Sequence, residues 1–163
     1  MLVLTIGIII LLADQISKFW VRYSFDLGQL DPLIPGFFNL TYLRNTGAAW
    51  GMLHGYNTWL GLLSIVVLAG LIFFRRSFIS NVLEHKIALG CLIGGIAGNL
   101  VDRIKLGYVT DFLDFHIGEW HWPAFNIADA AICTGVGIYI LSALWISHHP
   151  LRENGEKSDA RSE

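Results

Sequence analysis

Four long apolar runs dominate the hydrophobic pattern of the chain. The first begins at residue 1 and continues, with polar interruptions, to about residue 21. The others lie at 57–74, at about 87–104 and at about 127–147, and the run at 57–74 contains no charged residue. A helix of about 20 apolar residues is long enough to cross a bilayer. The pattern therefore predicts four membrane-spanning helices, with both chain ends on the same side of the membrane.

Two connecting segments, at about 25–55 and 107–123, carry strand signals. Residues 38–43 are rich in aromatic and β-branched types, and residues 108–117 are followed by Gly118-Glu119, which suits a two-residue hairpin turn. We expect both segments to form a small β-platform at the outer membrane surface. Residues 1–150 are expected to form a single membrane-embedded domain, and residues 151–163 a polar, disordered cytoplasmic tail.

Composition agrees with a membrane protein. Hydrophobic residues make up 54% of the chain and charged residues only 15%, whereas a soluble domain carries roughly 25% charged residues. A net charge of −2 without a basic stripe argues against a nucleic-acid partner. Cys91 and Cys133 both lie inside apolar runs, so we expect two small buried side chains and no disulfide.

The basic residues orient the chain only weakly, because six would lie inside and five outside. The tryptophans are more informative, since five of six would gather near the outer interface, where amphipathic rings are favoured. We therefore expect both termini in the cytoplasm.

Polar residues at the ends of the first and third runs are candidates for chemistry. Asp14 and Lys18 are four residues apart and share a helical face, so an ion pair that steadies the helix end is at least as well supported as catalysis. Ser17 points about 100° away from Lys18, which disfavours a Ser/Lys dyad. In the third run, glycines at every fourth position indicate close helix packing of the small-xxx-small kind.

One helical turn beyond those glycines come Asn99, Asp102 and Arg103. They indicate a buried polar network that either holds the fold together or grips a substrate backbone, and the residues alone leave both open. Asp111 and Asp114 are expected on opposite faces of a strand. Asn126 and Asp129 have the spacing of a helix cap, and spacing alone favours this role for Asp129 over catalysis.

The histidines do not form a recognisable metal-ligand set. His116 and His121 lie five residues apart across the expected turn, so a zinc site there would need further ligands. The sequence contains neither a phosphate-binding glycine loop nor a nucleophile elbow.

Taken in order, the polar clusters resemble those of the bacterial lipoprotein signal peptidases, also called signal peptidase II. Five motifs carry the resemblance: D-x-x-x-K at 14–18, N-x-G-A-A-aromatic at 45–50, G-G-x-x-G-N-x-x-D-R at 94–103, V-T-D-F at 109–112 and F-N-I-A-D at 125–129. The aromatic residue of the second motif is Trp50, where the family often has Phe. One motif alone would be weak, but five in the same order over residues 1–147 are specific.

This resemblance implies a mainly α membrane protein with four transmembrane helices and a small extracytoplasmic β-cradle. It implies that Asp111 and Asp129 are the catalytic pair of an aspartic endopeptidase. The residues that it places in the substrate site or in its support are Asn45, Asn99, Arg103, Asn126, Asp14, Lys18 and Asp102. Two carboxyls in a poorly hydrated cleft do not both ionise easily, so one keeps its proton.

The resemblance also implies the substrate and the location. Family members cleave diacylglyceryl-modified prolipoproteins just before the lipid-modified cysteine, need no metal or other cofactor, and are targets of globomycin. We expect a monomer in the bacterial inner membrane, in contact with membrane lipid, with the active site near the extracytoplasmic face. Two rivals remain: a proton-coupled transporter using Asp111, Asp129 and Arg103 as a relay, and a non-catalytic scaffold. The position of the charges at helix ends disfavours the transporter.

Overall fold

The computed structural model describes residues 1–47, 52, 55–78 and 82–148, and most of these residues are helical. The helices are α1 (Leu2–Ser24), α2 (Asn57–Phe73), α3 (Arg75–Phe78), α4 (Leu83–Leu106) and α5 (Ile127–His148). The strands are β1 (Leu30–Ile34), β2 (Phe38–Asn45), β3 (Val109–Ile117) and β4 (Trp120–His121). The predicted class, a mainly helical membrane protein with a small sheet, is confirmed. The expected tail at 151–163 and residues 48–50 of the second motif lie outside the described residues.

Three of the helices, α1, α4 and α5, are long and apolar enough to cross a membrane. The second predicted span corresponds to α2, which is apolar but shorter, with 17 residues. The short helix α3 follows α2 directly, and hydropathy could not indicate it because its two arginines end the apolar run.

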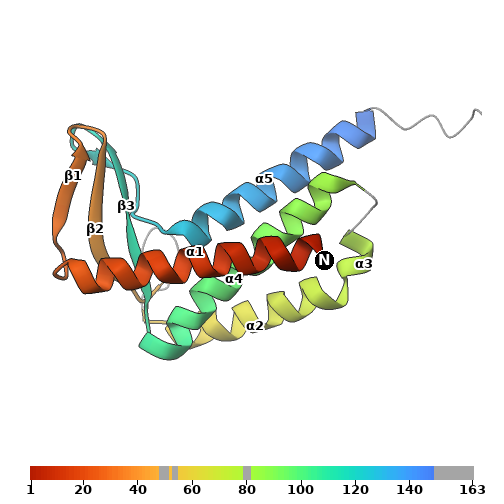
Figure 1. Cartoon of the computed structure of the whole chain (residues 1–163), viewed down its shortest axis with the longest axis horizontal. Coiled ribbons are helices and arrows are strands. Elements are labelled where there is room, and N and C mark those ends of the chain that lie inside the picture. The colour runs from red at the N-terminus through yellow and green to blue at the C-terminus, as the bar shows by residue number, and fades with distance from the viewer. Residues whose placement is uncertain (48–51, 53–54, 79–81, 149–163) are drawn as a thin grey trace, which may run out of the picture.

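Helix α4 lies between the other long helices and packs against α5, α1 and α2 (Figure 1). Its glycines make these contacts close. A Cβ atom added to Gly94 would lie 2.6 Å from the carbonyl oxygen of Gly7 on α1, and one added to Gly95 would lie 2.5 Å from that of Ala128 on α5. The predicted close packing at these glycines is therefore confirmed, since any side chain there would push the helices apart.

The four strands form one antiparallel sheet in the order β1-β2-β3-β4. The predicted hairpin turn is confirmed: Ile117 pairs with Trp120, and Gly118 adopts a positive φ of 58°. The sheet lies at one end of the helices, whereas the N-terminus and the last residues of α5 lie at the other (Figure 1). We call the end that carries the sheet the sheet end of the molecule.

A small apolar cluster attaches the sheet to the first helix. Val21 of α1, Tyr42 of β2 and Phe112 of β3 are buried against one another, and Phe25 and Leu40 pack at the edge of the cluster. Phe112 directly follows Asp111 in the chain, so this contact also fixes the strand beside the candidate catalytic residue.

The two cysteines differ in their surroundings. Cys91 on α4 is buried, whereas Cys133 on α5 is exposed, and both are free thiols. The expectation of two buried cysteines is therefore wrong for Cys133. Its apolar neighbours in sequence do not bury it, because they belong to a helix whose surface largely faces lipid or the cavity described below.

Candidate active site

Asp111 and Asp129 line the same cavity at the sheet end of the helices. The cavity has a volume of about 520 Å³. Its walls come from β2, α4, β3, the segment before α5, and α5 itself: Asn45, Asn99, Arg103, Val109, Asp111, Trp122, Pro123, Ala124, Phe125, Asp129, Ala130, Ile132 and Cys133. Asp111 comes from the strand β3 and Asp129 from the first turn of α5, so the packing of this strand against the start of the helix brings the two carboxyls into one cavity.

Asp111 is held by two side-chain amides. Asn45 Nδ2 donates to Asp111 Oδ2 at 2.9 Å, and Asn126 Nδ2 donates to Asp111 Oδ1 at 2.7 Å. The side chain of Asp111 is almost fully buried, with a relative exposure of 3%. Both oxygens of this carboxyl therefore have a fixed direction, which suits a group that must meet a substrate in one geometry.

Asp129 is held by the helix start as well as by an amide. Asn99 Nδ2 donates to Asp129 Oδ1 at 2.7 Å, and the backbone N–H of Asn126 donates to Asp129 Oδ2 at 3.3 Å. In return, the backbone N–H of Asp129 donates to Asn126 Oδ1 at 3.0 Å. The predicted cap is confirmed as a reciprocal capping box, and it leaves Asp129 in the cavity wall.

The environment of Asp111 disfavours its charged form. Burial is the main cause that raises the pKa of Asp111 to about 7, and the negative charge of Asp129 adds to it. The hydrogen bonds from Asn45 and Asn126 act in the opposite direction, together with the charge of Lys18. A carboxyl with this pKa is largely protonated below about pH 7, and in that form it can donate a hydrogen bond to a substrate carbonyl.

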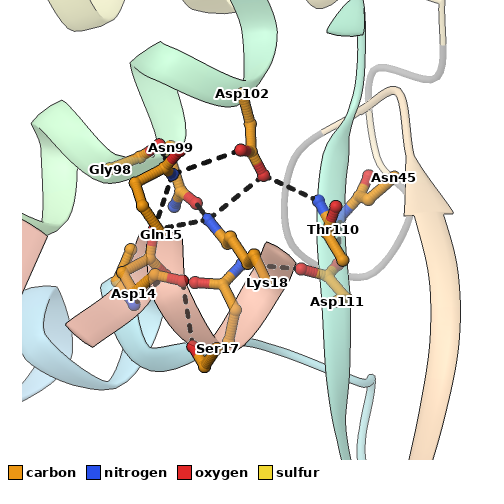
Figure 2. A network of polar contacts seen from close by, with 12 residues as sticks. Asp14, Gln15, Ser17, Lys18, Asn45, Gly98, Asn99, Asp102, Thr110 and Asp111 are labelled. Atoms are coloured by element: carbon orange, nitrogen blue, oxygen red, sulfur yellow. Dashed lines mark hydrogen bonds and ion pairs between the residues drawn. The ribbon is translucent and has the colours of Figure 1, made fainter. Parts of the chain in front are cut away.

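Behind the cavity lies a fully buried cluster of charges around Lys18 (Figure 2). Lys18 Nζ lies 2.8 Å from Asp14 Oδ2, 2.9 Å from Asn99 Oδ1 and 3.3 Å from Asp102 Oδ2. The predicted pairing of Asp14 with Lys18 is confirmed, and Ser17 donates to the backbone oxygen of Asp14 instead of joining Lys18. Each buried charge thus has an opposite charge and further hydrogen bonds, as such burial requires.

This cluster also fixes the backbone beside both candidate catalytic residues. Asp14 Oδ1 accepts from the N–H of Ala128 at 2.9 Å, and Asp102 Oδ2 accepts from the N–H of Thr110 at 3.0 Å. Ala128 precedes Asp129 and Thr110 precedes Asp111. Helices α1 and α4 therefore position the two chain segments that carry the carboxyls.

Two members of the cluster were missed by sequence reasoning. Gln15 Nε2 donates to the backbone oxygen of Gly98 at 3.1 Å and lies 3.2 Å from Asp102 Oδ1. Arg22 Nη1 donates to Thr110 Oγ1 at 2.9 Å and lies 3.7 Å from Asp102 Oδ1. The signal that could have found Arg22 is its spacing, because it is four residues after Lys18 and shares a face with Lys18 on α1.

Arg103 lies in the cavity wall, and only part of its guanidinium is hydrogen-bonded to residues that the structure describes. Its Nη2 donates to the backbone oxygen of Gly47 at 3.3 Å, while its buried Nε has no hydrogen-bond partner within the described part of the chain. Asn99 and Asp102 both contact Lys18, whereas Arg103 faces the two carboxyls. The network predicted in the third run is therefore both structural, through Asp102, and part of the cavity, through Asn99 and Arg103.

Asp114 and the two outer histidines form a separate cluster. Asp114 Oδ2 accepts from Asn39 Nδ2 at 2.7 Å, and His121 Nδ1 lies 2.9 Å from Asp114 Oδ1. The rings of His116 and His121 stack at 4.8 Å. Among the residues that the structure describes, no group of three or more His, Cys, Asp or Glu could hold a metal ion. Asp111 and Asp129 line the cavity and Asp114 does not. This agrees with the prediction that Asp114 and Asp111 lie on opposite faces of the strand.

Comparison with known proteins gives a consistent result along the chain. The family model described as signal peptidase (SPase) II matches residues 6–145. A lipoprotein signal peptidase of Syntrophus aciditrophicus is 48% identical over 139 residues, which cover 82% of this chain and 85% of that protein. One of Shewanella amazonensis is 44% identical over 140 residues, which cover 83% of each.

Solved structures agree with the sequence relatives. A bacterial membrane enzyme solved at 2.3 Å superposes with a TM-score of 0.86 and 31% identity, covering 94% of both chains. A second, solved at 1.9 Å, gives a TM-score of 0.79 and 34% identity, covering 87% of this chain and 92% of the other.

Proposed function

The chain belongs to the signal peptidase II family of bacterial membrane peptidases, and from this premise we propose that it is an aspartic endopeptidase acting on diacylglyceryl-modified prolipoproteins. It removes the signal peptide by cleaving just before the lipid-modified cysteine. Asp111 and Asp129 are the catalytic pair, and the enzyme works as a monomer without a metal or other cofactor.

The observation that carries this proposal is the pair of carboxyls in one cavity, linked by a single residue. Asn126 donates to Asp111 through its side chain, and its side chain and backbone form the capping box with Asp129. Because Asn126 is hydrogen-bonded to both carboxyls, it holds Asp111 and Asp129 at a fixed distance and orientation relative to each other. The cavity also contains Arg103, which can bind a peptide carbonyl.

Chemistry at such a pair needs one ionised and one protonated carboxyl. The ionised carboxyl takes a proton from a water molecule, whose oxygen attacks the scissile carbonyl carbon. The protonated carboxyl donates to the carbonyl oxygen and stabilises the charge that develops there. The raised pKa of Asp111 supports this division, because a carboxyl with a pKa of about 7 is available in protonated form near neutral pH.

We place the sheet end on the extracytoplasmic side of the bacterial inner membrane, with both termini in the cytoplasm. Arg75, Arg76 and Lys86 lie near the opposite end, but five other basic residues lie toward the sheet end, so the balance of basic residues orients the chain only weakly. The exposed rings of Trp20 and Tyr23 near the end of α1 are the stronger support, since aromatic side chains favour the membrane interface.

The lipid groups of the substrate stay in the bilayer while its peptide enters the cavity. Exposed apolar side chains on α1, α2 and α5 keep lipid close to these helices, and Cys133 makes the cavity wall continuous with the exposed surface of α5. An acyl chain beside α5 would thus leave the adjoining peptide close to Asp111 and Asp129.

The test uses the purified full chain in lipid vesicles and a synthetic precursor in two matched forms, with and without the diacylglyceryl group. With a chelator present, we expect mass spectrometry to find cleavage before the modified cysteine, inhibition of cleavage by globomycin, and at least about 100-fold slower turnover of the unmodified form. Equal rates for the two forms would contradict the proposed substrate, and loss of activity in the chelator would contradict the metal-free mechanism.

A further inference from the structure

We propose that Lys18 is a positioning residue for the reaction: acting through Asn99, it keeps Asp129 as the ionised member of the pair and so leaves the proton on Asp111. This inference rests on the proposed function and adds a division of labour to it. Lys18 itself does not line the cavity; its effect on the reacting atoms passes through one amide.

The Asn99 amide has a defined orientation. An ammonium group donates hydrogen bonds and accepts none, so the Asn99 atom that lies 2.9 Å from Lys18 Nζ must be the amide oxygen. The NH2 group of Asn99 then points the other way, to Asp129 Oδ1 at 2.7 Å. The backbone N–H of Asn126 donates to Asp129 Oδ2. Both oxygens of Asp129 therefore face groups that only donate, which favours the ionised carboxylate.

Asp111 differs from Asp129 in what lies behind its hydrogen-bond donors. Its two oxygens also accept from amide NH2 groups, and the oxygens of those amides are fixed by the backbone N–H groups of Gly47 and Asp129. The oxygens of both amides that donate to Asp111 thus accept from neutral peptide groups. The donor to Asp129 ends in a cation, and an amide polarised by a charge donates more strongly. This difference makes Asp129 the better place for the negative charge.

Several other charges surround Asp129. Besides Lys18, the charged groups that lie near Asp129 among the described residues are Asp14 on α1, Asp102 and Arg103 on α4, and Asp111 on β3. Asp14 and Asp102 both contact Lys18, and Arg22 approaches Asp102, so these two acids are matched by two cations. Lys18 is the only one of these charges joined to Asp129 by a hydrogen-bonded chain through the Asn99 side chain, in the part of the chain that the structure describes.

The reaction balances with this assignment. Asp129 takes a proton from water while the water oxygen bonds to the scissile carbon, and Asp111 gives its proton to the carbonyl oxygen, which leaves a gem-diol. When the C–N bond breaks, Asp129 passes its proton to the leaving amine. Asp111 takes back a proton from a gem-diol hydroxyl as the new carboxyl forms, and the pair returns to its starting state.

The test removes the cation from Asn99 without leaving an unmatched charge. The double variant Asp14→Asn/Lys18→Met loses one acid and one cation of the cluster. In this variant we expect the acidic limb of the pH profile of kcat to move to higher pH by about one unit, with kcat near neutral pH lowered about 10-fold or more. The single variant Lys18→Arg keeps a cation beside Asn99, so its acidic limb should stay at the wild-type pH.

The matched control is Arg22→Gln, which removes a cation from the same cluster at a site that contacts Asp102 and Thr110 but not Asn99. We expect its acidic limb to stay at the wild-type pH. The variant Asn99→Ala breaks the same link while Lys18 keeps its contacts with both acids. We expect its acidic limb to move to higher pH by about one unit as well, so it tests the proposal even if the double variant does not fold.

An acidic limb that stays in place in folded Asn99→Ala or in the folded double variant would overturn the role of Lys18, whatever the loss of rate. So would an equal shift in Arg22→Gln. If the wild-type enzyme does not cleave the lipidated precursor, the proposed function fails instead, and the two failures are therefore distinguishable.

Discussion

The two halves of helix α4 differ in how they contribute to the protein. The half distant from the sheet packs through glycines: Gly90 and Gly94 approach α1 so closely that a Cβ atom on either would clash, and Gly95 does the same against α5. The half near the sheet packs through polar side chains, among which Asn99 and Asp102 are buried and hydrogen-bonded. One helix thus combines a part that brings helices together with a part that holds reactive groups.

The first half makes the second possible. The line of glycines ends at Gly98, where a Cβ atom would lie 2.5 Å from Asp14 Oδ2. Because α1 and α4 are this close at Gly98, Lys18 can reach both Asn99 and Asp102 from the next turn of α1. Close helix packing at the glycines thus stabilises the fold directly. Burial of carboxyls at the sheet end costs free energy, and the packing of the glycine half offsets that cost.

The largest expected loss of stability comes from the glycine half. Gly94→Val would place carbon atoms where the backbone of Gly7 lies, and backbone cannot move aside as a flexible side chain does. We expect a loss of ~3 kcal/mol or more in the free energy of unfolding, measured by unfolding in detergent micelles. Gly137→Val on α5 is the matched control, since a Cβ atom there meets nothing within 4 Å.

A Gly94→Val protein that is as stable as Gly137→Val would show that the close approach of α1 and α4 is not needed for folding. The difference between the two halves of α4 would then have to be explained by the polar cluster alone.

The next effect has the opposite sign and comes from the sheet end. Burial raises the pKa of Asp111 from an ordinary 3.8 to about 7, so the folded state binds a proton that the unfolded state releases. Stability is therefore lost as the pH rises from about 4 through about 7. We expect Asp111→Asn to be more stable than wild type above about pH 7, by up to ~4 kcal/mol, and equally stable below about pH 4.

The measurement is the same detergent unfolding experiment, repeated at about five pH values across this range for both proteins. A gap between the two proteins that is independent of pH would mean that Asp111 titrates normally in the folded state. Such a result would remove the contrast between a stabilising glycine half and a sheet end that costs stability.

The sequence predicted the features that depend on local periodicity. Hydropathy indicated the apolar helices, helical spacing paired Asp14 with Lys18, and the Asn126–Asp129 spacing indicated the cap. These features were predictable because each is fixed within one or two turns of a single element. The catalytic assignment did not come from spacing, and depended on five motifs in the order typical of a known family.

Contacts between elements were the part that spacing could not supply. Asn99 meets Lys18 across 81 positions, and Asn45 meets Asp111 across 66, because helices cross and strands pair in a particular register. Cys133 was predicted to be buried because its neighbours are apolar, yet exposure on a membrane helix depends on which face meets protein. The stacking of His116 on His121 likewise required the register of the β3–β4 hairpin.

The central claim is that the carboxyls of Asp111 and Asp129, and no other buried aspartate, carry the reaction. Its most direct test compares cleavage of the lipidated precursor by three purified variants: Asp111→Asn, Asp129→Asn and Asp114→Asn. The third is a close control, because Asp114 lies on the same strand as Asp111, is 5% exposed compared with 3%, and accepts from an asparagine amide in the same way. We expect the first two variants to lose at least ~1,000-fold in kcat and Asp114→Asn to stay within about threefold of wild type. Full activity in folded Asp111→Asn or Asp129→Asn would contradict the claim.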